Sequence, residues 1–396
     1  MAQPRLTPET RTTAFYFSYF MGPGAAVMFL PIWLSEKGIS TEQIGIINAV
    51  PVFIILALNL VVGRLADKAS DWRQVIVIGA LIAGVVPIGL FFVNEFWGIL
   101  LFWTLAALPG GAIGPVLDAA TMRMARRNGS DFATIRAWGT VGYMMFNALT
   151  GFLVVWFGSA IFVPLFVGLA LLRAAVSLQL PAFRAPPEQA TVSAATPSKG
   201  KLREIILQPW FSLPLLGFAM VFGTHQLIGG FGALIWKEQG ISESIIGPLI
   251  ALGSLSETAV MFVWKRFGSR VSARQLMLIC AGVALLRWLL MAFSPPVWAL
   301  LLLQMLHGFT FALGFLGCVH FIANWTSEDI AAEAQSLFTV LQQMTSVVAL
   351  IGFGALVGWF GPYAYLGASV AAGLGGLCIW LSLRMKQPKE DAIATG

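Results

Sequence analysis

The sequence predicts an all-α membrane protein with twelve transmembrane helices in two six-helix halves. The first observation behind this prediction is composition: of 396 residues, 58% are hydrophobic and 11% are charged, and the mean hydropathy is +0.82. A soluble protein typically has about 25% charged residues. The second observation is a series of apolar runs of about 20 residues, the length that crosses roughly 30 Å of hydrocarbon as a helix. The third is a polar stretch that separates two sets of six such runs.

The apolar runs define the expected spans and three regions of the chain. The spans lie near 13–35, 43–65, 74–93, 96–123, 132–157, 159–180, 210–236, 243–264, 274–293, 297–324, 332–358 and 361–383. We therefore expect an N-terminal six-helix half at 1–180, a cytoplasmic linker at 181–209 and a C-terminal six-helix half at 210–396. The linker is rich in Pro, Ala, Ser and Thr, which is typical of a flexible connection.

The positions of the cations predict the orientation of the chain in the membrane. Nineteen of the 24 Lys and Arg residues lie at the termini, in the linker or in loops on the same side as the termini. Lys37 and Lys237 lie on the opposite side, and the other three lie in spans or at their edges. By the positive-inside rule, both termini are cytoplasmic. Because no block of five or more like charges occurs, we expect no nucleic-acid partner.

A short repeat relates the two halves. Gly38-Ile39-Ser40, followed by Ile44-Gly45, recurs 202 positions later as Gly240-Ile241-Ser242, followed by Ile246-Gly247. Parallel six-helix repeats are a transporter architecture, with the substrate bound near the middle of the membrane at the repeat interface. Trp33 and Trp236 precede the repeated segments, and we interpret them as residues of the aromatic belt at the membrane surface.

The segment after the second span carries charges of both signs and is a candidate gate. Its sequence is Gly63-Arg64-Leu65-Ala66-Asp67-Lys68, and we select Gly63, Arg64, Asp67 and Lys68 as the residues that clamp neighbouring helix ends. The segment resembles the signature loop of the major facilitator superfamily, which has a Gly-x-Leu-Ala-Asp-Lys pattern at this place. The resemblance ends at Ser70-Asp71-Trp72-Arg73, where the superfamily has Gly-Arg-Arg. An ordinary solvated turn that enforces topology is the alternative.

Four charges lie inside apolar stretches: Asp118, Arg136, Glu257 and Arg287. A charge at bilayer depth costs roughly 2.5 to 3.5 kcal/mol on insertion scales, so such residues usually line a polar pathway. Asp118 and Arg136 are on consecutive spans joined by a short loop, which lets them meet across the hairpin. Tyr143 follows Arg136 by two helical turns on the same face and could stack on a ring. We predict that these three side chains bind substrate; a salt bridge that only staples the hairpin is the alternative.

The C-terminal half repeats this arrangement with Glu257 in span eight, Arg287 in span nine and His307 in span ten. Burial favours a protonated carboxyl and a nearby guanidinium favours a carboxylate, so protonation of Glu257 can depend on access to water. His307 can donate or accept a proton and couple it to substrate. We assign proton coupling to Glu257, His307 and Arg287, and substrate binding to His307, Arg287 and His225 of span seven. A carboxylate permanently paired with Arg287 is the alternative for Glu257.

These residues resemble those of the lactose and phenylpropionate permease branches of the superfamily, over essentially the whole chain. The phenylpropionate permeases are the more similar, with an Asp and an Arg-x-Trp-Gly pattern in the N-terminal half and Ala/Ser-Glu, Arg-Trp and Gln-x-Leu-His in the C-terminal half. The lactose permease binds sugar through a carboxylate, an arginine and an aromatic at matching spacing. It has a glutamate where this chain has Thr310 and a lysine where this chain has Gln304. The proton-carrier role therefore moves to Glu257.

The expected function is proton-coupled import of a small solute by alternating access, with substrate held between the halves. Two arginines and an aromatic favour a phenylpropionate-type aromatic or other organic acid. A sugar or nucleoside symporter, or an exporter of the same fold, is the alternative. A membrane enzyme is disfavoured because no His or Cys pair has ligand spacing, and a receptor because no long charged tail follows Arg384. We expect a monomeric multi-pass protein of the bacterial cytoplasmic (inner) membrane, with no cofactor and no metal.

Overall fold

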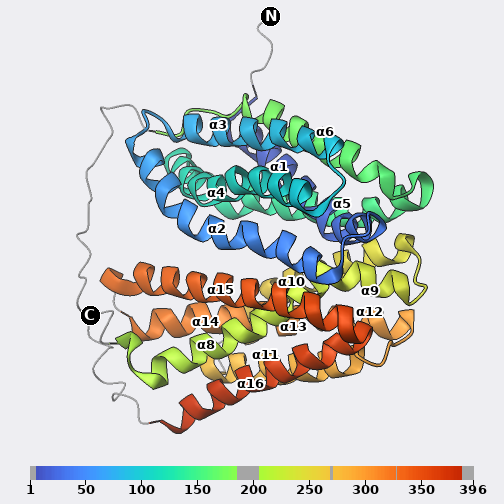
Figure 1. Cartoon of the computed structure of the whole chain (residues 1–396). Helices are drawn as coiled ribbons and strands as arrows, with labels where there is room; N and C mark the ends of the chain where they lie inside the picture. The colour runs from blue at the N-terminus through green and yellow to red at the C-terminus, as the bar shows by residue number, and fades with distance from the viewer. Residues whose placement is uncertain (1–5, 185–204, 268–270, 327, 386–396) are drawn as a thin grey trace, which may run out of the picture. The chain divides into compact units, whose positions relative to one another are not determined.

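The computed structural model describes residues 6–184, 205–267, 271–326 and 328–385, except for the side chains of residues 60, 63, 64, 67, 262, 264–267 and 328–333. Within these residues the chain is helical throughout and contains no strand (Figure 1). Eleven stretches are long and apolar enough to cross a membrane, and the last of them, Ala334–Arg384, contains two helices. The predicted all-α fold with twelve transmembrane helices is confirmed.

The first six spans match the predicted ones to within a few residues. They are α1 (Pro8–Glu36), α2 (Thr41–Lys68), α3 (Trp72–Val85) continued by the 3-10 helix η1 (Val86–Phe92), α4 (Phe96–Asn128), α5 (Phe132–Phe157), and α6 (Phe162–Ser177) preceded by η2 (Ser159–Ile161).

The second six spans contain two interrupted helices. They are α8 (Pro209–Thr224) with the π-helix η4 (Ile228–Gly232) and α9 (Ala233–Glu238), α10 (Glu243–Phe267), α11 (Ala273–Met291), α12 (Val297–Met305) with α13 (His307–Thr310) and α14 (Ala312–Trp325), α15 (Glu328–Phe360), and α16 (Ala364–Arg384) preceded by η6 (Gly361–Tyr363).

The sequence repeat corresponds to one turn that occurs twice. Gly38 and Gly240 adopt φ values of 77° and 81°, a region that glycine enters without the steric cost of a Cβ. After each glycine, the isoleucine N–H donates to a carbonyl five residues earlier: Ile39 to Leu34 at 3.1 Å and Ile241 to Trp236 at 3.0 Å. These bonds terminate α1 and α9 in the same way. The repeated sequence therefore corresponds to the same C-terminal helix ending in both halves.

The two tryptophans before these turns are buried. Trp33 is 3% exposed and Trp236 is 1% exposed, and the ring of Trp33 lies 5.2 Å from that of Phe162. Both side chains therefore pack against neighbouring helices, and their place in the aromatic belt at the membrane surface stays a prediction.

The described residues form two compact units. Unit 1 comprises Met1–Thr191 with Trp236–Ala251, and unit 2 comprises Val192–Ile235 with Leu252–Gly396. The assignment of Trp236–Ala251 to unit 1 has a direct physical basis. Lys237 Nζ lies 2.7 Å from Glu36 Oε1 and 3.2 Å from Glu243 Oε1, which ties this segment to the end of α1.

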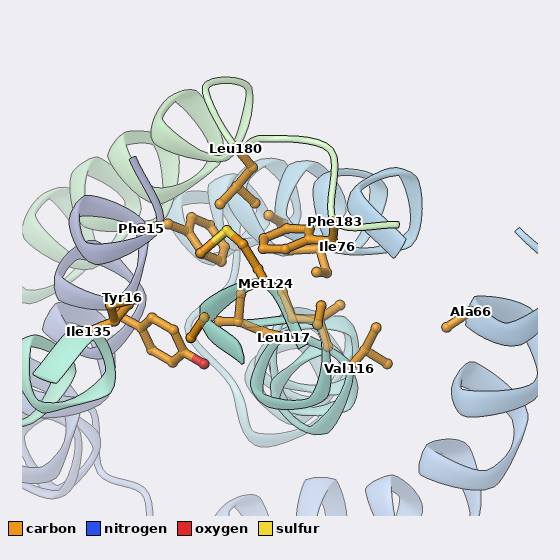
Figure 2. Close-up of a cluster of buried hydrophobic side chains, with 14 residues drawn as sticks. Phe15, Tyr16, Ala66, Ile76, Val116, Leu117, Met124, Ile135, Leu180 and Phe183 are labelled. Atoms are coloured by element: carbon orange, nitrogen blue, oxygen red, sulfur yellow. The ribbon is translucent and has the colours of Figure 1, made fainter. Parts of the chain in front are cut away.

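The interior of unit 1 is an apolar cluster that includes the chain after α6. Phe183 and Leu180 extend from that segment toward Met124 of α4, on the opposite side of which lies Phe15 of α1 (Figure 2). All four side chains are at most 2% exposed. This packing fixes the end of α6 against α1 and α4.

The guanidinium of Arg173 of α6 contacts two other helices of unit 1. Its Nη2 donates to the carbonyl of Ala83 at 3.0 Å, and its guanidinium lies 5.9 Å from the ring centroid of Tyr19. Pro87 has no N–H, so it cannot bond the carbonyl four residues earlier, which is that of Ala83. Arg173 supplies the missing donor where α3 changes into η1.

The interior of unit 2 is organised by aromatic pairs between α8 and the helices around it. Trp210 packs on Trp325 with ring centroids 4.8 Å apart, and Phe211 stacks on Phe321 at 5.4 Å. Both pairs join the start of α8 to the end of α14. Gly217 of α8 faces α16 without a side chain, since a Cβ there would lie 2.8 Å from Ile379.

Helices α1 and α5 approach closely at glycines, and this approach can be tested. A Cβ on Gly24 would lie 2.5 Å from the backbone oxygen of Tyr143, whereas a Cβ on Gly168 of α6 would have no atom within 4 Å. We expect Gly24→Ala to destabilise the protein by about 1–3 kcal/mol through overpacking. Gly168→Ala should be neutral or stabilising by about 0.5–1 kcal/mol, because alanine is the better helix former. Thermal unfolding in detergent measures both, and equal effects would contradict this account of the crossing.

Candidate functional site

The charged side chains of the N-terminal half meet as the sequence predicts. Arg136 Nε of α5 lies 3.6 Å from Asp118 Oδ1 of α4, and both side chains are partly exposed, at 32% and 46%. The same oxygen accepts a hydrogen bond of 2.6 Å from the hydroxyl of Tyr16, which comes from α1. Three helices thus contribute to one polar cluster, and Tyr16 is a member that the sequence analysis did not identify.

The guanidinium of Arg136 is held by an aromatic ring. Its Cζ lies 4.4 Å from the ring centroid of Phe20 and 5.6 Å from that of Tyr16. Gly139, on the helical turn after Arg136, leaves space for this ring, because a Cβ there would lie 2.6 Å from Phe20. Cation–π contacts of this kind orient a guanidinium without using its hydrogen-bond donors.

The cluster therefore retains polar atoms that can bind a solute. Among the described residues, Asp118 Oδ2 and the two terminal nitrogens of Arg136 have no hydrogen-bond or ion-pair partner. A carboxylate oxygen accepts from a hydroxyl, and the guanidinium fork binds a carboxylate in bidentate geometry. This arrangement suits a solute with hydroxyl groups, a carboxylate, or both.

Tyr143 lies on α5 two turns after Arg136, as predicted, and its backbone contacts Gly24 of α1. The aromatic hydroxyl bonded to Asp118 belongs to Tyr16 instead. A sequence signal for Tyr16 exists, since the chain has 5 tyrosines and two of them, Tyr16 and Tyr19, are one helical turn apart in the first span. The spacing of Tyr16 and Tyr19 does not reveal, however, that Tyr16 bonds Asp118 on a helix distant in the sequence.

In unit 2, Arg287 of α11 is fully buried and hydrogen-bonded to neutral groups. Its Nη2 donates to Oε1 of Gln304, and its Nη1 lies 3.0 Å from Oγ1 of Thr310 and 3.3 Å from Nδ1 of His307. Its Cζ also lies 4.6 Å from the ring centroid of Trp288. The two residues at which this chain departs from the lactose permease pattern, Gln304 and Thr310, are thus both partners of the buried arginine.

Glu257 faces His307 and does not form an ion pair with Arg287. The distance from Glu257 Oε2 to His307 Nε2 is 3.8 Å, and the side chains are 26% and 19% exposed. Arginine only donates, so His307 Nδ1 beside Arg287 is an acceptor and the ring proton of a neutral His307 lies on Nε2. That proton points toward Glu257. The permanent Glu257–Arg287 pair, the alternative raised by the sequence, is not formed.

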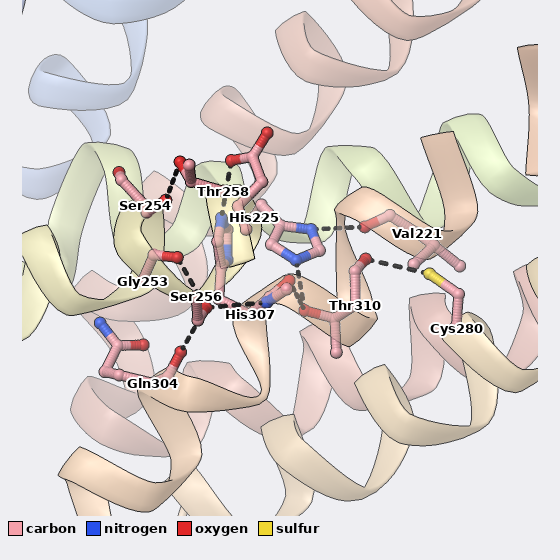
Figure 3. A network of polar contacts seen from close by, with 12 residues as sticks. Val221, His225, Gly253, Ser254, Ser256, Thr258, Cys280, Gln304, His307 and Thr310 are labelled. Carbon is pink, nitrogen blue, oxygen red and sulfur yellow. Dashed lines mark hydrogen bonds and ion pairs between the residues drawn. The ribbon is translucent and has the colours of Figure 1, made fainter. Parts of the chain in front are cut away.

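His225 is the bridge between the two interrupted helices of unit 2. Its Nδ1 lies 3.0 Å from the carbonyl of Val221, so this nitrogen carries the proton, and its Nε2 accepts from the hydroxyl of Thr310 at 2.9 Å (Figure 3). The rings of His225 and His307 are 5.1 Å apart. His225 follows the end of α8 and Thr310 ends α13, so the bond joins two helix breaks.

A serine of α10 fixes the position of the α13 break. Ser256 Oγ accepts from the N–H of Gly308 at 3.0 Å and donates to the carbonyl of Gly253 at 2.7 Å (Figure 3). Gly308 admits this approach because a Cβ there would lie 2.5 Å from the backbone oxygen of Ser256. Ser256 precedes Glu257, so the same turn of α10 positions the carboxylate beside His307.

The predicted gating residues Gly63, Arg64, Asp67 and Lys68 are helical and do not form a loop. Helix α2 continues to Lys68, because the N–H of Ala69 still donates to the carbonyl of Leu65 at 3.0 Å. Lys68 is exposed, and the side chains of the other three lie outside the described residues. The predicted loop is therefore shorter and later, at 69–71.

The residues that replace the superfamily's Gly-Arg-Arg anchor the chain after α6. The Asp71 carboxylate accepts from the backbone N–H of Phe183 and Arg184, at 3.0 and 2.9 Å. Arg73 donates to the carbonyls of Leu180 and Leu178, at 2.6 and 2.8 Å. The first residues of the predicted linker are thus held by unit 1, and residues 185–204 lie outside the described part of the chain.

The chain as a whole is similar to known membrane transporters. The profile described as the MFS_1 like family matches residues 10–362. The chain is 27% identical over 366 residues to a probable 3-phenylpropionic acid transporter of Escherichia coli (strain K12), covering 90% of this chain and 91% of the relative. It is 24% identical over 375 residues to the maltose permease of Geobacillus stearothermophilus, covering 93% and 92%. The crystal structure of the nucleoside transporter NupG has a TM-score of 0.83 at 18% identity, covering 96% of this chain and 100% of that one, which shows a shared fold.

Thr310 is the centre of the unit 2 network, and its contribution can be measured. Thr310→Val keeps the shape of the side chain but leaves Arg287 and His225 each without one partner, which we expect to cost about 1–3 kcal/mol. Thr258→Val is the matched control, since among the described residues the hydroxyl of Thr258 bonds only the carbonyl of Ser254 in its own helix, at 3.0 Å. Thermal unfolding in detergent should show a larger loss for Thr310→Val. Equal losses would mean that the network contributes no stability.

Proposed function

Because the chain belongs to the MFS_1 like family of the major facilitator superfamily, whose members transport small solutes, we propose that it is a proton-coupled symporter that imports a small organic acid of phenylpropionate type. The observation that carries this proposal is the pairing of a half-buried carboxylate, Glu257, with His307 next to a fully buried arginine. A group at membrane depth that can gain and lose a proton beside a fixed cation is suited to coupling.

The substrate assignment rests on the N-terminal cluster. Arg136 presents its terminal nitrogens toward a solute while Phe20 covers part of the guanidinium, which matches an acid with an apolar body. One relative, at 27% identity, is described as a probable 3-phenylpropionic acid transporter. In this proposal the unit 1 cluster of Asp118, Arg136, Tyr16 and Tyr143 and the unit 2 network act on the same solute, by alternating access.

The proton path that we propose uses Glu257 as carrier and His307 as its partner. Arg287 holds Nδ1 of His307 as an acceptor, so Nε2 carries the proton that faces the carboxylate. The separation of 3.8 Å exceeds hydrogen-bond length, and transfer needs a small approach of the two groups or one water. Arg287 acts as a positioning residue because its charge is held by Gln304, Thr310 and His307. His225 acts through Thr310.

The proposal includes the orientation and environment of the chain. Both termini are placed in the cytoplasm of a bacterium, in the inner membrane, by the excess of Lys and Arg on their side. The transporter is proposed to act as a monomer, with protons and the solute as its partners.

A sugar or nucleoside symporter is the second candidate. One oxygen of Asp118 is available to accept from a hydroxyl, which an organic acid without hydroxyl groups would not use. Relatives include permeases described for maltose and raffinose, at 24% and 23% identity. An exporter of the same fold would use the same residues with the opposite direction of flux.

The direct test is a transport assay in liposomes with a pH-sensitive dye. A panel of phenylpropionate-like acids, disaccharides and nucleosides is added, and passive entry of weak acids is subtracted with empty liposomes. Substrate-dependent alkalinisation outside the vesicles would support proton symport and identify the solute class. Silence across the panel from folded protein would overturn the proposal.

Substitution of the proton carrier separates coupling from binding. We expect Glu257→Gln to abolish uphill uptake while exchange of preloaded substrate continues, because a neutral side chain keeps its shape but cannot release a proton. Glu238→Gln, at an exposed glutamate, is the control and should transport normally. Loss of substrate binding in Glu257→Gln would contradict the carrier role.

Two substitutions in unit 1 distinguish an acid from a sugar. Arg136→Ala should lower affinity by about 2–5 kcal/mol for an organic acid, since it removes the cation that binds the carboxylate. Asp118→Asn should maintain or improve binding of an acid, because it removes a repelling charge, and should weaken binding of a sugar, because it removes the better acceptor. Calorimetric titration in detergent measures both variants, with Arg126→Ala, at an exposed arginine, as control. Unchanged affinity in Arg136→Ala would remove the unit 1 cluster from the binding site.

A further inference from the structure

The start of α10 is held in unit 1 by a three-residue ion cluster at the side of the molecule opposite the N-terminus. Lys237 Nζ lies between Glu36 Oε1, at 2.7 Å, and Glu243 Oε1, at 3.2 Å. Glu36 also accepts a hydrogen bond from the hydroxyl of Ser159. One cation thus neutralises two carboxylates that would otherwise repel, and we call Glu36, Lys237 and Glu243 the Lys237 latch.

The latch closes over a tight helix crossing. A Cβ on Gly247 of α10 would lie 2.5 Å from the backbone oxygen of Asn147 of α5. A Cβ on Gly151, one turn later on α5, would overlap the backbone oxygen of Glu243. The two helices contact each other through their backbones. The crossing therefore exists only while the start of α10 stays packed against α5.

The closed crossing leaves a polar side chain unsatisfied. Asn147 is fully buried, and neither its Oδ1 nor its Nδ2 has a hydrogen-bond partner among the described residues. A buried amide without partners is destabilising and calls for an explanation. If the start of α10 lifts away, water reaches Asn147, and this gain offsets part of the lost packing. Opening of the crossing therefore costs less free energy than the loss of packing alone.

The latch is built on the same helix as the proposed proton carrier. Helix α10 runs without interruption from Glu243 to Phe267, with Glu243 in the latch and Glu257 beside His307. Residues up to Ala251 belong to unit 1, and those from Leu252 belong to unit 2. A continuous helix transmits a tilt at one end to the other end, which lies about 21 Å away for 14 residues at 1.5 Å each.

We propose that the Lys237 latch is a gate on the side opposite the N-terminus, and that its opening frees the start of α10 from α5 during each transport cycle. Partly exposed ion pairs contribute little net stability, so the latch can open readily. The gate rests on the transporter activity shown for the family, and its residues are separate from those proposed to bind solute or proton.

Asn147→Cys provides a reporter of the crossing, in a chain whose Cys280, Cys318 and Cys378 have been replaced. The thiol is covered while Gly247 is seated and becomes reactive toward a water-soluble maleimide when the crossing opens. In this background, Lys237→Met should raise the labelling rate several-fold, because Glu36 and Glu243 then repel. Lys37→Met is the matched control, since Lys37 lies on the same side but donates to Asn94 at 2.6 Å outside the latch.

The charge-swapped triple variant Glu36→Lys, Lys237→Glu and Glu243→Lys separates gating from local unfolding. It should bring labelling back toward the rate of the reporter chain, because one charge at position 237 again lies between two charges of opposite sign, at the end of α1 and the start of α10. Equal labelling in Lys237→Met and the reporter chain would overturn the gate. So would fast labelling that the swap does not reduce, which would indicate unfolding. These readouts need no substrate, so the gate can fail while proton-coupled uptake persists, or stand if that uptake is absent.

Discussion

The buried guanidinium of Arg287 is the constraint on which the polar interior of unit 2 depends. A charge that is fully removed from solvent needs partners for its donors, and no carboxylate of the described residues supplies them. Gln304 and Thr310 meet this need with an amide oxygen and a hydroxyl, and His307 contributes Nδ1. Because the arginine does not use Glu257, that carboxylate stays available to His307.

The helix breaks of unit 2 follow from the same network. α12, α13 and α14 are separated at Leu306 and Phe311, and α8 ends before His225. In a membrane, an interrupted backbone is tolerated only where protein groups satisfy its polar atoms. Ser256 accepts from the N–H of Gly308, and the His225 ring donates to the carbonyl of Val221. The side chains that organise the proposed proton path therefore also make the breaks possible.

The charged residues of unit 1 are less buried than Arg287 and are paired with each other. Asp118 and Arg136 are half-exposed and face each other at 3.6 Å, with Tyr16 and Phe20 of α1 holding one partner each. This leaves donors and acceptors that a solute can use. In unit 2 by contrast both terminal nitrogens of Arg287 are hydrogen-bonded internally, while its buried Nε has no partner among the described residues. The two units thus combine an open charged cluster with a closed one, which suits binding in the first and proton coupling in the second.

The sequence by itself determined the number of transmembrane helices and their limits to within a few residues, the repeat that contains Gly38 and Gly240, and the meeting of Asp118 with Arg136 across a hairpin. These features depend on apolar length, on glycine's access to positive φ and on a short loop, and each can be read locally. Only the tertiary structure decided that Tyr16 bonds Asp118, that Arg287 bonds Gln304 and Thr310 instead of Glu257, and that Asp71 and Arg73 anchor the chain after α6. The physical reason is that a buried polar group bonds whichever partner the packing of distant helices brings within reach, and sequence spacing does not encode that distance.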